Sequence, residues 1–259
     1  MLSLLRRIAL ILATTGCGAA LSAPSAEIPA LRLCWENTEK PPYLSTEKTG
    51  GAEGISVELV NAVLQRAGLR AQSVVWPWKR CLAEVATGNI DLVPNASRAP
   101  ERMQYALYSK PLYRTHMAFF YDPRRMPTPP RIETLADLKA FRVGGVLGFN
   151  YVHLKGVPLD TGAKSREALL RKLESGRIDL ADEQLEVMLE AIRRLELPAA
   201  HFAYVRDPFL DAKDFHILIN KQHPQAEALR ERLDAAIGEL ERDGTLGKIN
   251  ARATAPKAP

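Results

Sequence analysis

The pattern of hydrophobic and polar positions predicts a chain that alternates short strands with amphipathic helices. Residues 31–35 alternate as a strand, and residues 57–67 carry apolar side chains at helical spacing before Gly68. Further strands are predicted over 69–75, 90–93, 142–148, 202–206 and 215–219, and further helices over 78–87, 134–140, 165–175 and 226–241. Alternation of this kind is typical of α/β proteins.

A short sequence occurs nearly unchanged in two distant parts of the chain. Residues 88–92 read Gly-Asn-Ile-Asp-Leu, and residues 176–180 read Gly-Arg-Ile-Asp-Leu. In each copy a predicted helix ends at the glycine and a buried strand follows. Helix–glycine–strand units are common enough to recur by chance, and the alternative is a pair of α/β lobes of similar build.

The N-terminal residues have the layout of a secretory signal peptide. Arg6-Arg7 form a short positive region, an apolar stretch opens at Ile8, and small residues follow as far as Ala26. Residues 14–16 interrupt the apolar stretch, which is therefore too short for a membrane span of about 20 residues. We predict that residues 1–26 are a cleaved signal peptide and that the mature protein is periplasmic.

Two cleavage routes remain open. Gly16-Cys17 is compatible with a lipoprotein site that would leave a lipid anchor on Cys17, although Thr14 stands where such sites usually carry Leu. The alternative is ordinary peptidase cleavage near residues 22–26. At the other end of the chain, residues 251–259 are rich in Ala, Pro and Lys and predict a disordered tail.

The charge distribution argues against a nucleic-acid partner. The formal net charge of +5 falls to +3 when residues 1–26 are removed, because this segment holds two arginines and no acid (5 − 2). Lys and Arg are scattered among Asp and Glu, without the basic stripe that phosphate backbones require. The five histidines are dispersed and form no zinc or triad motif. We expect no nucleic acid, no metal and no cofactor.

Cys34 and Cys81 are the only cysteines beyond Cys17. In an oxidising compartment a lone pair predicts a disulfide. Two buried free thiols and a reactive thiol remain as alternatives.

Seven segments together resemble a known family. They are Pro42-Tyr43, Trp78-Lys79-Arg80, 97–102, 109–113, 135–138, 142–144 and 244–249. Each motif is weak alone, but in this order they resemble the extracellular solute-binding proteins of ABC transporters, in the family that binds polar amino acids (family 3). The resemblance covers roughly residues 30–250. It implies an α/β, two-lobed fold of the type II periplasmic-binding-protein class, with two crossover hinge segments and the ligand in the cleft.

This resemblance also implies a domain organisation and a function. The first lobe would comprise residues 27–114 plus 208–259, and the inserted second lobe residues 115–207. The protein would be a monomeric solute-binding component, without enzymatic activity, that passes a small carboxylate-bearing solute to the permease of an ABC transporter. One alternative is a periplasmic enzyme of the same fold, similar to cyclohexadienyl or arogenate dehydratases, with Glu36 or Glu183 as the acid. Another is a ligand-sensing module.

The site residues follow from the same resemblance. Arg102 matches the arginine that binds the ligand carboxylate through a planar fork, and Ser97 matches a hydroxyl that caps this carboxylate. Tyr43 and Trp78 match aromatic residues that sandwich the ligand. Arg98 lies one helical turn from Arg102, so a solvated helix face is the alternative for either arginine.

Three positions depart from the family pattern. Asn95 replaces a usual glycine, and Phe149 with Asn150 follow Gly148 where a threonine is more common. Gln184 stands where many members carry the aspartate that binds the ligand's ammonium group, and Glu183 would face away if the strand continues. A neutral amide cannot replace that ion pair. We therefore expect a site for a carboxylate and a weakened site for an ammonium group.

Overall fold

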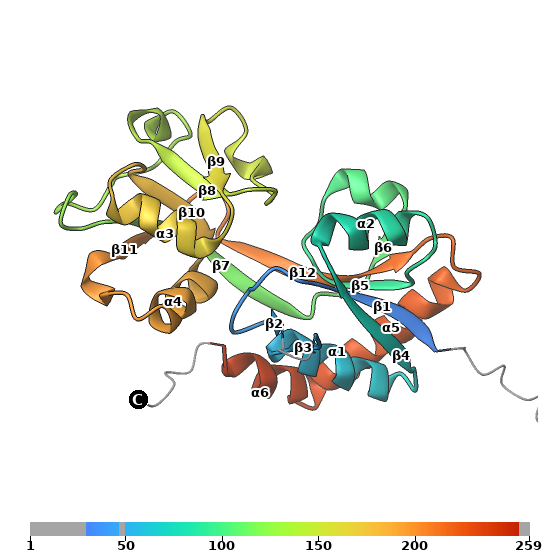
Figure 1. Cartoon of the computed structure of the whole chain (residues 1–259). Coiled ribbons are helices and arrows are strands. Elements are labelled where there is room, and N and C mark those ends of the chain that lie inside the picture. The colour runs from blue at the N-terminus through green and yellow to red at the C-terminus, as the bar shows by residue number, and fades with distance from the viewer. Residues whose placement is uncertain (1–29, 47–49, 254–259) are drawn as a thin grey trace, which may run out of the picture.

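The computed structural model describes residues 30–46 and 50–253, and it shows two groups of strands and helices joined by two long strands (Figure 1). The joining strands are β7 (Tyr113–Tyr121) and β12 (Ala212–Asn220). They pair antiparallel where the chain crosses between the groups, with Phe215 opposite Tyr113. The predicted signal peptide and Cys17 lie outside the described residues, and the lobe boundaries given above remain predictions.

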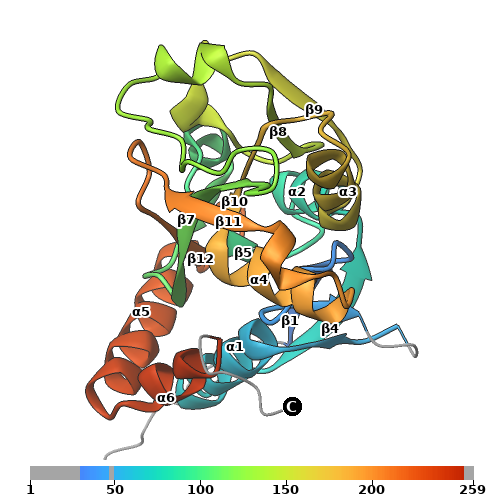
Figure 2. The ribbon, with the colours of Figure 1, turned by 90° about the vertical axis from the view of Figure 1, so that its left-hand side faces the viewer.

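The first lobe is built on three parallel strands. β1 (Leu31–Glu36) lies between β4 (Ala71–Trp76) and β5 (Leu92–Ala96), and β12 pairs antiparallel with the far edge of β5. The remaining elements are α1 (Ile55–Arg66), α2 (Trp78–Ala86), α5 (Ala226–Arg242), α6 (Thr245–Ala251), β6 (Ala106–Tyr108), the 3-10 turn η1 (Pro100–Gln104) and the hairpin of β2 (Ser45–Thr46) with β3 (Ala52–Glu53). Helices α1, α5 and α6 pack together along one side of this lobe (Figure 2).

The second lobe repeats this arrangement. Its sheet order β9–β8–β10–β7 matches the order β4–β1–β5–β12 of the first lobe, with three parallel strands and one antiparallel crossover strand in each. The elements are β8 (Val143–Val146), β9 (Leu159–Ala163), β10 (Leu180–Gln184), β11 (Ala203–Arg206), α3 (Arg166–Glu174), α4 (Leu185–Arg194) and the 3-10 turns η2 (Asp137–Ala140), η3 (Val152–Leu154) and η4 (Ala199–His201).

The near-repeat in the sequence forms the same local structure in both lobes. Asp91 accepts hydrogen bonds from the backbone and the guanidinium of Arg32 at the start of β1, at 2.8–3.1 Å. Asp179 binds Arg142, just before β8, through the same three groups at 2.6–3.0 Å. Each aspartate therefore ties the helix–glycine–strand unit to the neighbouring parallel strand, which confirms two units of similar build.

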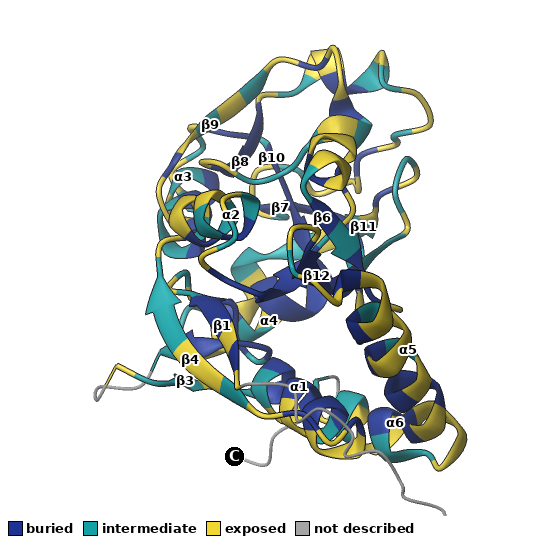
Figure 3. Cartoon of the chain, turned by 90° about the vertical axis from the view of Figure 1, so that its right-hand side faces the viewer, coloured by how far each residue is buried: buried dark blue, intermediate teal, exposed yellow. Residues whose placement is uncertain are grey.

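Apolar side chains at the predicted spacing form the core. The buried stripe of α5 comprises Leu229, Leu233, Ile237 and Leu240, and its polar face is exposed (Figure 3). Burying a leucine side chain of this kind stabilises a fold by about 1.5–3 kcal/mol. Each lobe has its own apolar cluster around its sheet, and Val187 of α4 in the second lobe packs into the cluster of the first.

Several expected boundaries differ from the observed ones. The helix expected over 134–140 is only the 3-10 turn η2, which ends at Ala140 because Phe141 has an extended backbone; the Asp137 carboxylate accepts the Thr134 backbone N–H at 2.7 Å. The prediction of a disordered tail over residues 251–259 is wrong for the first of these residues. Helix α6 includes Ala251, and the Ala253 N–H donates to Asn250 O at 2.9 Å. Residues 254–259 lie outside the described part of the chain.

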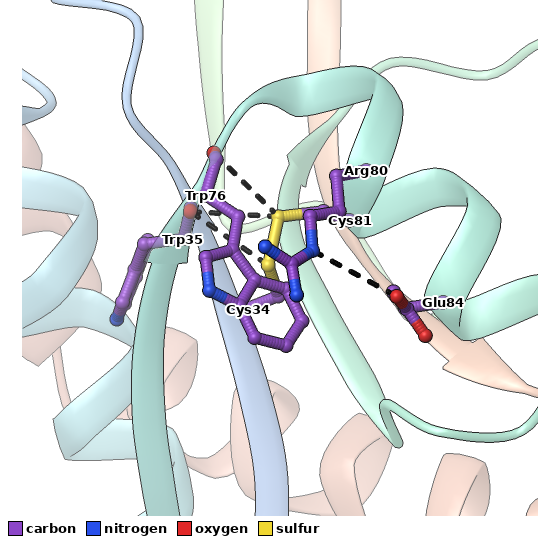
Figure 4. Close-up of a disulfide and its surroundings, with 6 residues drawn as sticks. All are labelled: Cys34, Trp35, Trp76, Arg80, Cys81 and Glu84. Atoms are coloured by element: carbon purple, nitrogen blue, oxygen red, sulfur yellow. Dashed lines mark hydrogen bonds and ion pairs between the residues drawn. A yellow bond between two sulfur atoms is a disulfide. The ribbon is translucent and has the colours of Figure 1, made fainter.

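Cys34 and Cys81 form the disulfide expected from the cysteine count, which joins β1 to α2 (Figure 4). Their Cα atoms are 5.7 Å apart, which is within the usual range for bridged cysteines. Both residues are fully buried in the apolar cluster beneath α2. The bridge therefore fixes the helix whose first residue, Trp78, lines the cavity described below.

Candidate functional site

A cavity of about 250 Å³ lies between the two lobes, beside the crossover strands. The first lobe contributes Glu36, Lys40, Trp78, Asn95, Ser97 and Arg102; the second contributes Phe149, Asn150, Tyr151, Arg166, Glu183 and Gln184; β7 and β12 contribute Met117, Lys213 and Phe215. Pockets for drug-sized ligands are typically about 300–1,000 Å³, so this cavity suits a small solute. All site residues expected from the sequence line it except Tyr43.

Tyr43 belongs to the core behind the cavity wall. Its side chain is buried and stacks on Tyr113 at a centroid distance of 4.3 Å, and Tyr113 stacks on the cavity residue Phe215 at 4.8 Å. An isolated antiparallel β-bridge between Lys40 and Leu44 turns this loop inward. The two prolines before Tyr43 gave no indication of this turn in the sequence. Tyr43 therefore supports the wall and does not contact the cavity.

Arg102 is a buried cation at the edge of the cavity. It lies in η1, directly after β5, where a strand's carboxyl end meets a helix and ligands often bind in α/β sheets. Its Nη1 donates to Ser97 O at 3.0 Å, and its guanidinium lies 5.2 Å from the Trp78 ring centroid. By contrast, Arg98 is exposed and lies over the ring of Tyr108. The two arginines therefore have different environments despite their spacing.

Asn95 occupies a position that requires a left-handed backbone. Its φ of 61° explains why glycine suits this position and why asparagine can replace it. The Asn95 Oδ1 accepts hydrogen bonds from Ser56 Oγ at 2.7 Å and from Tyr113 Oη at 3.0 Å. Its Nδ2 is buried and has no hydrogen-bond partner among the described residues, and Asn95 is one of the residues that line the cavity.

Arg166 is the main site residue that the sequence reasoning missed. It is the first residue of α3, after the N-cap Ser165, and it had been treated only as part of that helix. It is 7% exposed, its Nη1 donates to Glu39 O of the first lobe at 2.6 Å, and its Nε lies 3.1 Å from Glu183 Oε2. Burial and the positive end of the helix dipole both disfavour a cation, so an arginine buried at a helix N-terminus is unusual. The sequence does not show that Arg166 is buried, and only the structure identifies it as a site residue.

Gln184 is already engaged by protein groups. Its Oε1 accepts from Thr115 Oγ1 at 3.1 Å, and its Nε2 donates to Glu183 Oε1 at 3.2 Å. Glu183 lines the cavity as well, contrary to the expectation that it faces away, because β10 ends at Gln184 and α4 begins. The amide therefore has little capacity left for a ligand ammonium group.

Burial shifts the titration of the charged groups around the cavity. Burial raises the pKa of Glu36, while the attraction of Lys40 opposes this rise. Burial holds the pKa of Lys40 well below its usual range, and its Nζ lies 3.1 Å from the Phe215 ring centroid. Burial also lowers the pKa of Lys213, which donates to Asn150 O at 2.9 Å. Even without Lys40, the basic side chains of the lining (Lys79, Arg102, Arg166 and Lys213) outnumber the acidic ones (Glu36 and Glu183), which favours an anionic solute.

Beside the cavity, His153 lies between two buried carboxylates. Its Nε2 is 3.0 Å from Asp182 Oδ2 and 3.2 Å from Asp207 Oδ2. These three side chains are of the type that bind metals, and the fold brings them together from distant parts of the sequence. Lys213 lies close enough to interact with both acids. The two carboxylates would stabilise a protonated His153, so this cluster fits an ion network beside the loop after β8.

His153→Gln is expected to lower stability more at about pH 6 than at about pH 9. Burial disfavours the imidazolium, but hydrogen bonds to Asp182 and Asp207 raise the pKa of His153 above its usual value. The stabilisation is therefore complete below the unfolded pKa of about 6.5 and is lost as pH rises through the folded pKa. Urea unfolding of both proteins across this range measures the difference. An equal loss at both pH values would contradict a charged His153.

The comparisons with known proteins agree with this architecture. The sequence model of the bacterial extracellular solute-binding proteins, family 3, matches residues 31–254. Two curated relatives are each 23% identical. One is the "Probable amino-acid-binding protein YxeM" of Bacillus subtilis (80% of this chain, 77% of the relative), and the other is a "Probable histidine-binding protein" of Neisseria gonorrhoeae (93% and 90%).

Among solved structures, the fold matches an ancestral arginine-binding protein bound to glutamine. The TM-score is 0.67 at 24% identity, over 86% of this chain and 96% of that one. At this identity the likeness establishes the type II periplasmic-binding-protein fold and not the ligand. The family match covers nearly the whole described chain. The chain therefore belongs to family 3 of the bacterial extracellular solute-binding proteins.

Proposed function

We propose that this protein is the solute-binding component of an ABC transporter and that it binds a small carboxylate-bearing solute, an amino acid or a related compound, between its lobes. The observation that carries the proposal is the buried Arg102 at the edge of the interlobe cavity. A guanidinium presents parallel N–H groups to a carboxylate and stays charged at any physiological pH. Trp78 and Ser97 lie beside it and supply an aromatic face and a hydroxyl.

Solute binding would close the lobes around β7 and β12. Hydrogen bonds already cross between the lobes, among them those from Arg166 Nη1 to Glu39 O at 2.6 Å and from Arg194 Nη1 to Ser45 Oγ at 3.1 Å. A solute that meets Arg102 on one side and Phe149 or Asn150 on the other would add to these contacts. Closure of two domains around a ligand gives the permease a surface that differs from the open form.

The proposal includes export to the periplasm and a monomeric state. The expected signal peptide over residues 1–26, with cleavage near residues 22–26 or lipidation at Cys17, would place the binding domain outside the cytoplasmic membrane. Within residues 30–46 and 50–253, no helix combines the length and the apolar character that a membrane span requires. The lobe boundaries at 114/115 and 207/208 belong to the same proposal.

An enzyme of the dehydratase type is the second candidate, and Glu36 is the observation that favours it. This carboxyl lines the cavity, and burial raises its pKa, as a general acid requires. A binding protein would release its solute unchanged, whereas a dehydratase would release a product lighter by one water. The mass of the released solute separates the two functions.

Thermal unfolding with a panel of amino acids and small mono- and dicarboxylates tests the proposal. A ligand at one hundred times its Kd stabilises the folded protein by about 2.7 kcal/mol, so even moderate affinity raises Tm measurably. We expect at least one carboxylate to raise Tm and to reduce the radius of gyration in small-angle scattering. If no compound of the panel raises Tm and reduces the radius of gyration, the proposal is contradicted.

Common polar amino acids are expected to bind weakly. Gln184 replaces an acid and is already bonded to Thr115 and Glu183, so a ligand ammonium group lacks its usual partner. Calorimetry across the standard amino acids measures this. Submicromolar binding of lysine, histidine or glutamine would show that the substitution at Gln184 does not set the specificity.

A further inference from the structure

We propose that the solute carries two anionic groups, one bound by Arg102 of the first lobe and the other by Arg166 of the second, as in a short-chain dicarboxylate. This inference rests on the function proposed above and specifies the chemical class of the solute. It assigns Arg166 as the residue that determines specificity.

Unpaired buried donors in the cavity wall are the first support. The Nη2 of Arg166 is buried and has no hydrogen-bond partner among the described residues, and the same holds for Asn95 Nδ2. Both residues line the cavity, from opposite lobes. A buried donor without a partner costs free energy, which an acceptor on the solute would recover.

Matched arginine–aromatic pairs are the second support. Arg102 lies 5.2 Å from the Trp78 ring centroid in the first lobe, and Arg166 lies 4.9 Å from the Phe149 ring centroid in the second. An aromatic ring that faces a guanidinium fixes the orientation of the guanidinium plane. The N–H groups at the edge of that plane can still donate to a carboxylate. The cavity therefore has one restrained guanidinium on each side.

The charges around the cavity are the third support. Its lining includes the basic residues Lys79, Arg102, Arg166 and Lys213, beside the buried Lys40, against the acidic residues Glu36 and Glu183. Glu183 pairs with the Nε of Arg166 and leaves the Nη2 of that guanidinium unpaired. A solute with a single carboxylate would offset one of the excess positive charges of the lining, whereas a dianion would offset two of them.

Arg166 also donates to Glu39 O across the cleft, so a role in closure alone must be distinguished from a role in solute recognition. Closure affects every solute equally, because the contact to Glu39 does not depend on what fills the cavity. Recognition of a second anion affects dicarboxylates and spares monocarboxylates. The ratio of the two affinities therefore separates the two roles.

Calorimetric titration with dicarboxylates of about three to six carbons, each beside the monocarboxylate of equal length, tests the proposal. We expect the best dicarboxylate to bind wild type about 30-fold or more tightly than its monocarboxylate. Arg166→Gln should remove this preference, because the dicarboxylate loses far more affinity than the monocarboxylate, which loses only the contribution of the closure contact to Glu39. Arg171→Gln, on the exposed face of the same helix, should retain it.

Equal binding of mono- and dicarboxylates by wild type would overturn the inference and leave the proposed function intact, and this comparison needs no variant. A uniform loss for both classes in a folded Arg166→Gln protein would assign Arg166 to closure only and overturn the inference as well. If wild type binds none of these compounds and no amino acid either, the proposed function itself fails.

Discussion

Replacement of Arg102 by alanine is expected to weaken solute binding about thirty-fold or more. The loss corresponds to about 2–5 kcal/mol, the cost of removing one partner from a desolvated charge pair. Arg102 is 9% exposed and is held by Ser97 O and the Trp78 ring. Water therefore has little access to the position of the guanidinium and cannot readily take over its hydrogen bonds to the solute. Titration calorimetry with the best solute of the panel measures the effect.

Two variants control for charge and for position. Arg102→Lys should recover little affinity, because an ammonium group cannot form the two parallel hydrogen bonds of a guanidinium. Arg98→Ala should change affinity hardly at all, since Arg98 is exposed and lies over Tyr108. If Arg98→Ala abolished binding while Arg102→Ala did not, the assignment of the carboxylate site would be wrong.

Removal of the Cys34–Cys81 disulfide is expected to lower the free energy of unfolding by about 4 kcal/mol, the entropic estimate for a closed loop of this length. The bridge closes a sequence separation of 47 residues, and both cysteines are fully buried. The measurement is urea unfolding of wild type and of the double variant Cys34→Ala/Cys81→Ala, which keeps the site free of new buried polar groups.

Intact-mass analysis with thiol alkylation under non-reducing conditions provides the control. Protein exported to an oxidising compartment and isolated from it should show no labelled thiol at Cys34 or Cys81. Two labelled thiols in this material would contradict the bridge, and a loss of stability well under 1 kcal/mol in the double variant would contradict its role.

Local signals predicted the fold well because they depend on neighbouring residues. The stripe of α5, the cap of α3 at Ser165 and the paired Asp91 and Asp179 units all follow from spacing within a few residues. Strand β7 and helix α4 did not emerge from the pattern. Every residue of β7 from Thr115 onward is at least partly buried, so the strand lacks the alternation of a half-exposed strand.

The site was less predictable because its contacts join distant residues. Arg102 and Ser97 were found through a contiguous motif, whereas Arg166 meets Glu39 across 127 positions of sequence. Tyr43 was misplaced since a loop position does not reveal whether a ring faces a cavity or stacks on Tyr113. The His153 cluster likewise depends on residues brought together only by folding. Burial and charge pairing, which require the three-dimensional structure, identify these residues.

Native mass spectrometry tests the central claim most directly. Ligand-free protein would be incubated with an equimolar panel of amino acids and small mono- and dicarboxylates and then analysed as the intact complex. We predict that wild type and Arg98→Ala retain one carboxylate-bearing solute, that this solute is released with unchanged mass, and that Arg102→Ala does not retain it. Retention by Arg102→Ala as strong as by wild type, failure of wild type to retain any solute, or release of a compound of altered mass would contradict the account.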